Sequence, residues 1–137
     1  MANTIYSLYK QTILSPGGSP INLLTDTIRA ALVTAGYTPN YATDQYYSSV
    51  SANTIGTPQQ LTSPSVTLGV FNAASPVTFT AVSGAQVTQI VIYKDTGTGS
   101  SSPLIANINV STGLPVTPNG GNITITWDSG ANKIFAL

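Results

Sequence analysis

Residues 90–110 read IVIYKDTGTGSSSPLIANINV and carry the clearest strand signals of the chain. An apolar, β-branched and aromatic run is followed by a Gly-, Ser- and Thr-rich stretch at 95–102 and then by a second apolar run. The second run alternates, so one face would carry Leu104, Ala106, Ile108 and Val110. Two such runs around a Gly-rich break predict a long β-hairpin of half-buried strands. We expect this hairpin to be central, with the other strands paired with it or packed against it.

The composition favours one β-rich domain. The chain has 137 residues, of which 42% are hydrophobic and only 6% are charged, against about 25% charged in an average protein. Thr and Ser supply much of the polarity, and Thr suits strands. The net charge is zero, so the chain lacks the basic surface that binding to nucleic acid or to an acidic membrane would need. A neutral surface of this kind favours association with another protein.

Turn residues divide the second half of the chain at short intervals. They leave six expected strands: 61–70, 77–81, 87–94, 104–110, 122–127 and 133–136. Short strands at regular spacing predict an all-β protein with a β-sandwich or jelly-roll-like domain. That domain would span residues 21–137, after an N-terminal arm or short helix with a Pro/Gly linker at 1–20. Trp127 is expected in its core.

Two N-terminal segments are ambiguous. Residues 3–14 fit a short helix capped by Asn3 or Thr4, or an arm that pairs with a neighbouring subunit. Residues 21–35 fit a helix capped by Thr25 or Asp26, but their alternation also suits a strand.

Tyrosines are concentrated in residues 36–58, which read as a long loop with one helical turn. Tyr37, Tyr41, Tyr46 and Tyr47 lie there. Tyrosines in such a loop can bury their rings against the fold. They can also form a binding surface, because Tyr offers a large contact area at low entropic cost. Both interpretations stay open.

Asp95-Thr96-Gly97 matches the short motif of aspartic proteases. That chemistry needs two carboxylates sharing one proton, so a chain of this length would have to dimerise. Lys94 precedes the motif where an apolar residue would be needed to bury the carboxylate. An Asp followed by Gly at a hairpin tip is typical of a turn. We therefore expect a turn here, and a hydrolase that uses Asp95 is a remote alternative.

The sequence gives little support for other catalytic sites or for a metal site. The chain has no His and no Cys, which excludes Ser-His-Asp triads, Cys nucleophiles and disulfides. The four acidic residues are dispersed, whereas a Ca²⁺ site would need a cluster. We predict no enzymatic activity and no cofactor. No apolar run approaches the roughly 18 residues that span a bilayer, and the first residues do not resemble a signal peptide. We expect synthesis in the cytoplasm and no membrane partner.

Five segments in order resemble a family of small structural proteins of tailed bacteriophages. They are DTIRAALVT at 26–34, GYTPN at 36–40, DQYYSSV at 44–50, VIYKDTGT continuing to PLI across 91–105, and ITITWDSG at 123–130. The resemblance implies a capsid decoration (cement) protein with a β-sandwich, commonly a trimer on the outer capsid shell. It also implies that residues 28–34 are a strand.

This resemblance sets the functional expectation. The chain would bind the assembled head lattice and clamp neighbouring capsomers, with the major capsid protein and further copies of itself as partners. It would lie on the outer surface of the virion. The expected contact residues are Ile5, Tyr6, Tyr9, Tyr37, Tyr41, Tyr46 and Tyr47. The alternative is a tail-fibre or head-fibre adhesion module that binds a host surface glycan through aromatic side chains.

Overall fold

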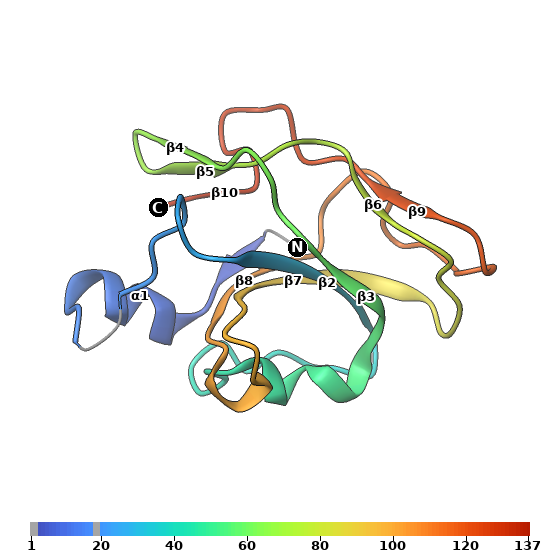
Figure 1. The fold of residues 1–137 in the computed structure, drawn as a ribbon, viewed down its shortest axis with the longest axis horizontal. Helices are drawn as coiled ribbons and strands as arrows, with labels where there is room; N and C mark the ends of the chain where they lie inside the picture. Colours follow the sequence, from blue (N-terminus) through green and yellow to red (C-terminus); the bar gives the residue numbers. More distant parts are fainter. Residues whose placement is uncertain (1–2, 18–19) are drawn as a thin grey trace.

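The computed structural model describes residues 3–17 and 20–137. Within these ranges, strands form three antiparallel sheets, and a single short α-helix, α1 (Ser7–Leu14), lies at one end of the molecule (Figure 1). The all-β prediction is therefore confirmed, while the β-sandwich or jelly-roll arrangement stays a prediction. Residues 1–2 and 18–19 of the predicted arm and linker lie outside the described part.

The largest sheet has five strands with the expected hairpin inside it. Their order is β1 (Thr4–Ile5), β8 (Leu104–Ile108), β7 (Val87–Lys94), β2 (Ile28–Thr34) and β3 (Thr54–Gln60). β7 lies in the middle, between β8 and β2. The central position of the hairpin is confirmed.

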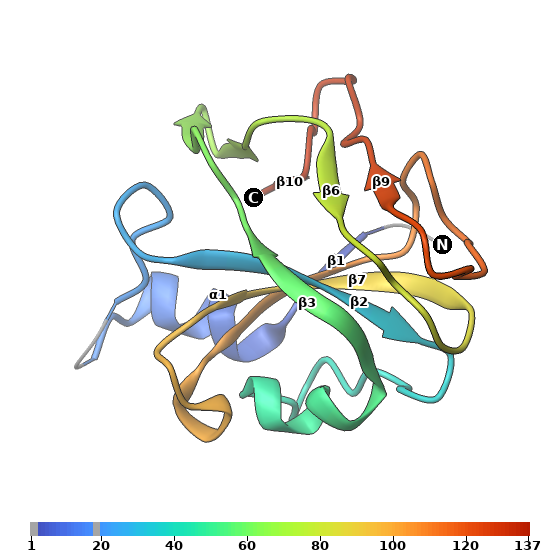
Figure 2. The same ribbon diagram turned by 45° about the vertical axis from the view of Figure 1, so that its right-hand side comes forward.

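Two smaller sheets cover one face of the large sheet. One contains β10 (Phe135–Ala136), β5 (Val70–Asn72) and β4 (Ser65–Thr67), and the other pairs β6 (Val77–Phe79) with β9 (Ile123–Ile125). Figures 1 and 2 show them on the side of the sheet opposite the loops that follow β2 and β7. The second layer on this face explains why Trp127, which follows β9, is buried as predicted.

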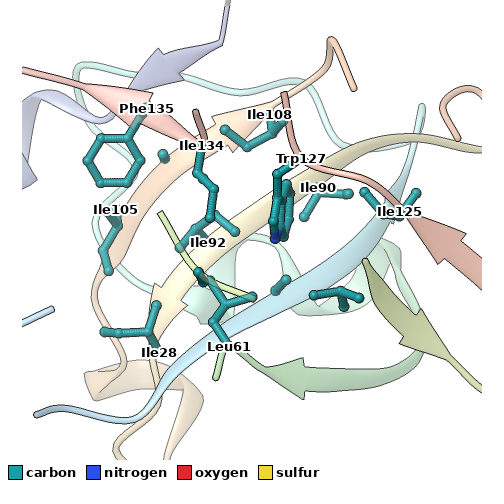
Figure 3. Close-up of a cluster of buried hydrophobic side chains, with 14 of the residues drawn as sticks. Ile28, Leu61, Ile90, Ile92, Ile105, Ile108, Ile125, Trp127, Ile134 and Phe135 are labelled. Carbon is teal, nitrogen blue, oxygen red and sulfur yellow. The ribbon is translucent and has the colours of Figure 1, made fainter. Parts of the chain in front are cut away.

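Each face of the large sheet has its own hydrophobic core. The first core lies under the small sheets and includes Ile28, Leu32, Ile90, Ile92, Ile105, Ile108, Ile125, Trp127 and Phe135; Figure 3 shows its close packing. The second core lies on the other face and contains Tyr6, Ala31, Val33, Tyr37, Val50, Val91, Tyr93 and Leu104. β2 contributes to both, which explains its nearly continuous apolar sequence.

The prediction that β8 is half-buried is wrong, because all five of its residues are buried. Its predicted face is also wrong at one position. Ile92 lies opposite Ala106, but Tyr93 lies opposite Leu104, so Ile105 is an extra residue in the ladder. Such a bulge reverses the alternation, and Leu104 therefore joins the second core while Ala106 joins the first.

The ambiguous N-terminal segments are now assigned. Residues 28–34 form a strand, as the resemblance implies, and residues 7–14 form the expected short helix. β1 precedes this helix and pairs with β8 of the same chain.

Strand β3 was missed, because residues 36–58 read as a loop. Gly56 and Pro58 both suggest a break, yet β3 is an edge strand, where proline is tolerated. The register with β2 shifts between Ala30 and Leu32, and Gly56 has a φ of +66° beside this irregularity. The two residues that suggested a loop therefore mark a bulge in a strand.

The predicted strand at 61–70 is wrong. The chain instead forms the hairpin of β4 and β5, whose turn contains Leu68 at φ +51° and Gly69 at φ +80°. Of the remaining strands, β2 and β7 have the predicted bounds, whereas β6, β8, β9 and β10 are shorter than predicted. Flanking residues such as Asn122 and Val110 lie outside the strands.

Candidate functional site

Residues 35–53, here called the tyrosine segment, cover the second core. The segment runs between β2 and β3 and includes two 3-10 helices, η1 (Tyr47–Ser49) and η2 (Ser51–Asn53). Its backbone is attached to neighbouring elements: the amide of Ser7 donates to the Tyr41 carbonyl (2.9 Å), and the amide of Leu104 donates to the Gln45 carbonyl (2.8 Å). The segment is therefore held between the start of α1 and the hairpin.

Tyr37 is the polar centre of this segment. Its hydroxyl lies 2.8 Å from the Tyr6 hydroxyl and donates to Asp44 Oδ2 at 2.7 Å. Asp44 Oδ2 also accepts the amide of Asn40 at 2.9 Å. Burial raises the pKa of Tyr6 to about 12, and burial together with the Tyr6 and Asp44 contacts raises the pKa of Tyr37 further. Both hydroxyls are therefore neutral at physiological pH.

Two buried amides support the same segment from the sheet. The Asn107 side-chain amide donates to Gln89 Oε1 at 2.7 Å, and Gln89 Nε2 donates to the carbonyls of Thr34 (3.1 Å) and Tyr37 (2.9 Å). Sequence reasoning did not single out Gln89 or Asn107. The sequence feature that could have identified them is an amide side chain within a mainly apolar strand. Such a side chain requires a hydrogen-bonding partner when it is buried.

The hairpin tip contacts the other end of the tyrosine segment. The rings of Tyr47 and Tyr93 stack with centroids 4.2 Å apart. The amide of Tyr47 donates to the Ser102 carbonyl at 2.8 Å. Within the tip, the Ser102 hydroxyl donates to the Thr98 carbonyl (2.8 Å) and accepts the Thr96 amide (3.0 Å). The tip is therefore internally hydrogen-bonded.

The predicted contact residues fall into two groups. Ile5, Tyr6, Tyr9 and Tyr37 are buried within the chain. Tyr41 and Tyr47 are half-buried, and Tyr46 is 36% exposed. The tyrosine segment thus brings Tyr6, Tyr37 and Tyr41 together, while Tyr9 packs edge-on against Phe135 in the first core. The part of this set that a partner can reach is Tyr41, Tyr46 and Tyr47.

Asp95 forms the predicted turn. Its Oδ1 accepts the amide of Gly97 at 2.8 Å, and its Oδ2 accepts Arg29 Nε at 2.6 Å. The Gly97 bond and the Arg29 side chain hold the pKa of the Asp95 carboxyl below its ordinary value. Lys94 pairs with Asp26 at 3.0 Å. The motif that resembles a protease therefore joins the end of β7 to the start of β2.

No group of three or more potential metal-binding side chains occurs among residues 3–17 and 20–137. No helix in the described part of the chain is long and apolar enough to cross a membrane.

The chain matches no protein-family model and no curated protein.

Proposed function

We propose that this chain is a capsid decoration protein of a tailed bacteriophage, which binds the outside of the assembled head and stabilises it. One observation carries the proposal. Segments that resemble the decoration-protein pattern are far apart in the sequence but contact one another in the fold. Seven of the eight residues of the second core lie in these segments: Ala31, Val33, Tyr37, Val50, Val91, Tyr93 and Leu104.

Polar contacts join the same segments. The Arg29–Asp95 and Lys94–Asp26 ion pairs connect the segment at 26–34 with that at 91–105. The Tyr37–Asp44 hydrogen bond connects two others. The matched segments therefore form one packed unit in this chain, which supports the proposal.

The exposed side of the tyrosine segment is the surface that we assign to the head. Tyr46 and Tyr47 lie there beside the hydroxyl-rich tip at 95–102. Many neutral contacts of this kind add up when several copies engage one lattice. We propose that copies associate around a rotation axis, most simply a threefold axis.

The test is binding to heads. Heads of the parent phage that lack this chain are mixed with the purified protein, and bound protein is measured after sedimentation. We expect occupancy to saturate in proportion to lattice sites and the heat tolerance of the heads to rise. Tyr46→Ser should lower occupancy, whereas Thr62→Ser, an exposed position outside the tyrosine segment, should not.

The alternative, a glycan-binding adhesion module, predicts a different result. The free protein would then bind host surface polysaccharide and not heads. Binding to polysaccharide with no binding to heads would overturn the proposal.

A further inference from the structure

A large groove lies away from the tyrosine segment, between α1 and the C-terminal strand. This groove has a volume of about 1190 Å³ and is lined by residues of β1, α1, β10 and two loops. Figure 1 shows α1 at the same end of the molecule as the C-terminus. Four exposed apolar side chains lie along it: Ile13, Leu14, Val110 and Leu137. Exposed apolar side chains gathered in one groove indicate an interaction site.

Two edge strands border the groove. β1 is the last strand of the large sheet and β10 is the last strand of a small one, and both line the groove. The amide of Tyr6 donates to the Ile105 carbonyl of β8, so strand alternation turns the backbone groups of Ile5 away from β8. A sheet edge with this geometry accepts an additional extended strand.

The charges of the groove indicate what the strand would carry. Arg29 and Lys94 are already paired with aspartates. In the described part of the chain, Lys10 and Lys133 have no carboxylate partner, and both line the groove. Asp128 also lines it, so the side chains that line the groove carry one net positive charge for the occupant to neutralise.

A second copy of this chain does not provide the complementary charge. Asp26 and Asp95 are in ion pairs, and Asp44 accepts hydrogen bonds from Tyr37 and Asn40. The remaining carboxylate, Asp128, lies in the groove itself. We infer that the groove binds an extended segment of a different protein, in which apolar and acidic side chains alternate. This inference does not depend on the capsid proposal.

The test uses two synthetic peptides and the full-length, isotope-labelled protein. One peptide of about six residues, roughly 20 Å when extended, alternates valine and glutamate; the other alternates valine and lysine. Amide NMR spectra are recorded at low salt, where charge contacts are least screened. We expect shifts confined to β1, α1 and β10, and an affinity for the glutamate peptide at least about tenfold higher, which corresponds to one good charge contact.

Two matched pairs of variants locate the contact. Lys10→Glu should weaken binding of the glutamate peptide roughly tenfold, whereas Gln11→Glu changes the charge of the next residue outside the groove and should have little effect. Leu14→Ser should weaken both peptides, whereas Leu68→Ser should not, although Leu68 is even more exposed (98% against 86%).

Three results would overturn the inference. They are equal affinity for the two peptides, peptide-induced shifts outside the groove, and no shift at millimolar peptide. Concentration-dependent shifts of the groove without peptide would assign it to a second copy instead. If Leu14→Ser changes the spectrum of the free protein, the Lys10 and Gln11 pair decides alone.

Discussion

Tyr37 joins three parts of the molecule. Its hydroxyl contacts Tyr6 next to α1 and Asp44 within the tyrosine segment, and its backbone carbonyl accepts a hydrogen bond from Gln89 in β7. A buried polar group that loses its partner costs more than the net gain from forming the bond. Loss of the Tyr37 hydroxyl should therefore weaken the attachment of the whole tyrosine segment to the rest of the fold.

Removing that hydroxyl tests its contribution. Tyr37→Phe leaves the buried Tyr6 hydroxyl and the Asp44 carboxylate each short of one partner, so we expect the free energy of unfolding to fall by about 1–3 kcal/mol. Urea denaturation measures it. Tyr46→Phe is the control, because Tyr46 is exposed, and its effect should stay within about 0.5 kcal/mol. Equal effects of the two variants would contradict the assigned role.

Asp95 predicts a dependence of stability on pH. Its pKa is lowered in the folded state, so its contribution is complete above the ordinary carboxyl pKa of about 3.9 and is lost as pH falls through the folded value. Asp95→Asn should therefore flatten the decline in unfolding free energy below about pH 4. Urea denaturation between neutral and acidic pH measures this.

Asp128→Asn is the matched variant for this experiment. Asp128 accepts the amide of Gly130 as Asp95 accepts that of Gly97, but no ion pair to it is present among the described residues. Asparagine keeps the accepting oxygen at both positions. If both variants flatten the curve equally, the Arg29 contact is not the cause.

At the scale of elements, β3 depends on one backbone position. Gly56 has a φ of +66°, and a Cβ atom there would lie 3.3 Å from Val82 in the first core. Gly120 has a similar φ of +86°, with open space around it. Gly56→Ala should lower the free energy of unfolding more than Gly120→Ala. At Gly120 we expect only the loss of about 1–2 kcal/mol that a left-handed backbone conformation causes for alanine. Thermal denaturation of the two variants measures the difference, and equal losses would contradict the packing contribution at Gly56.

The same elements show where sequence reasoning succeeds and stops. β7 was predicted with its bounds because five of its eight residues are β-branched, which favours a strand. β3 was missed because Gly and Pro signal loops and edge strands alike. The β4–β5 turn could not be found because Leu68 adopts a left-handed conformation that leucine rarely takes.

The candidate site was predictable only in part. The tyrosines were located correctly as a group, but their exposure depends on partners remote in sequence. Tyr37 is buried because Tyr6, at the start of α1, and Gln89, in β7, reach it. The groove was not predicted, because its lining comes from both ends of the chain and no local pattern marks it.

For the molecule as a whole, stability should be almost independent of salt. The two described salt bridges are partly exposed, and such pairs contribute about 0–1 kcal/mol each. Raising sodium chloride from about 0.1 to about 1 M screens them, yet we expect the unfolding free energy to change by less than about 2 kcal/mol. Urea denaturation at both concentrations checks this. A larger loss would indicate charge interactions beyond these two pairs.

The burial of Trp127 provides two separate optical signals. It is the single tryptophan of the chain and lies in the first core, whereas Tyr6, Tyr37 and Tyr93 lie in the second. Tryptophan fluorescence therefore follows one side of the large sheet, and near-ultraviolet tyrosine absorbance is weighted toward the other. Coincident unfolding curves would mean that both layers melt as one cooperative unit. An earlier tyrosine transition would mean that the tyrosine segment can detach while the small sheets stay folded.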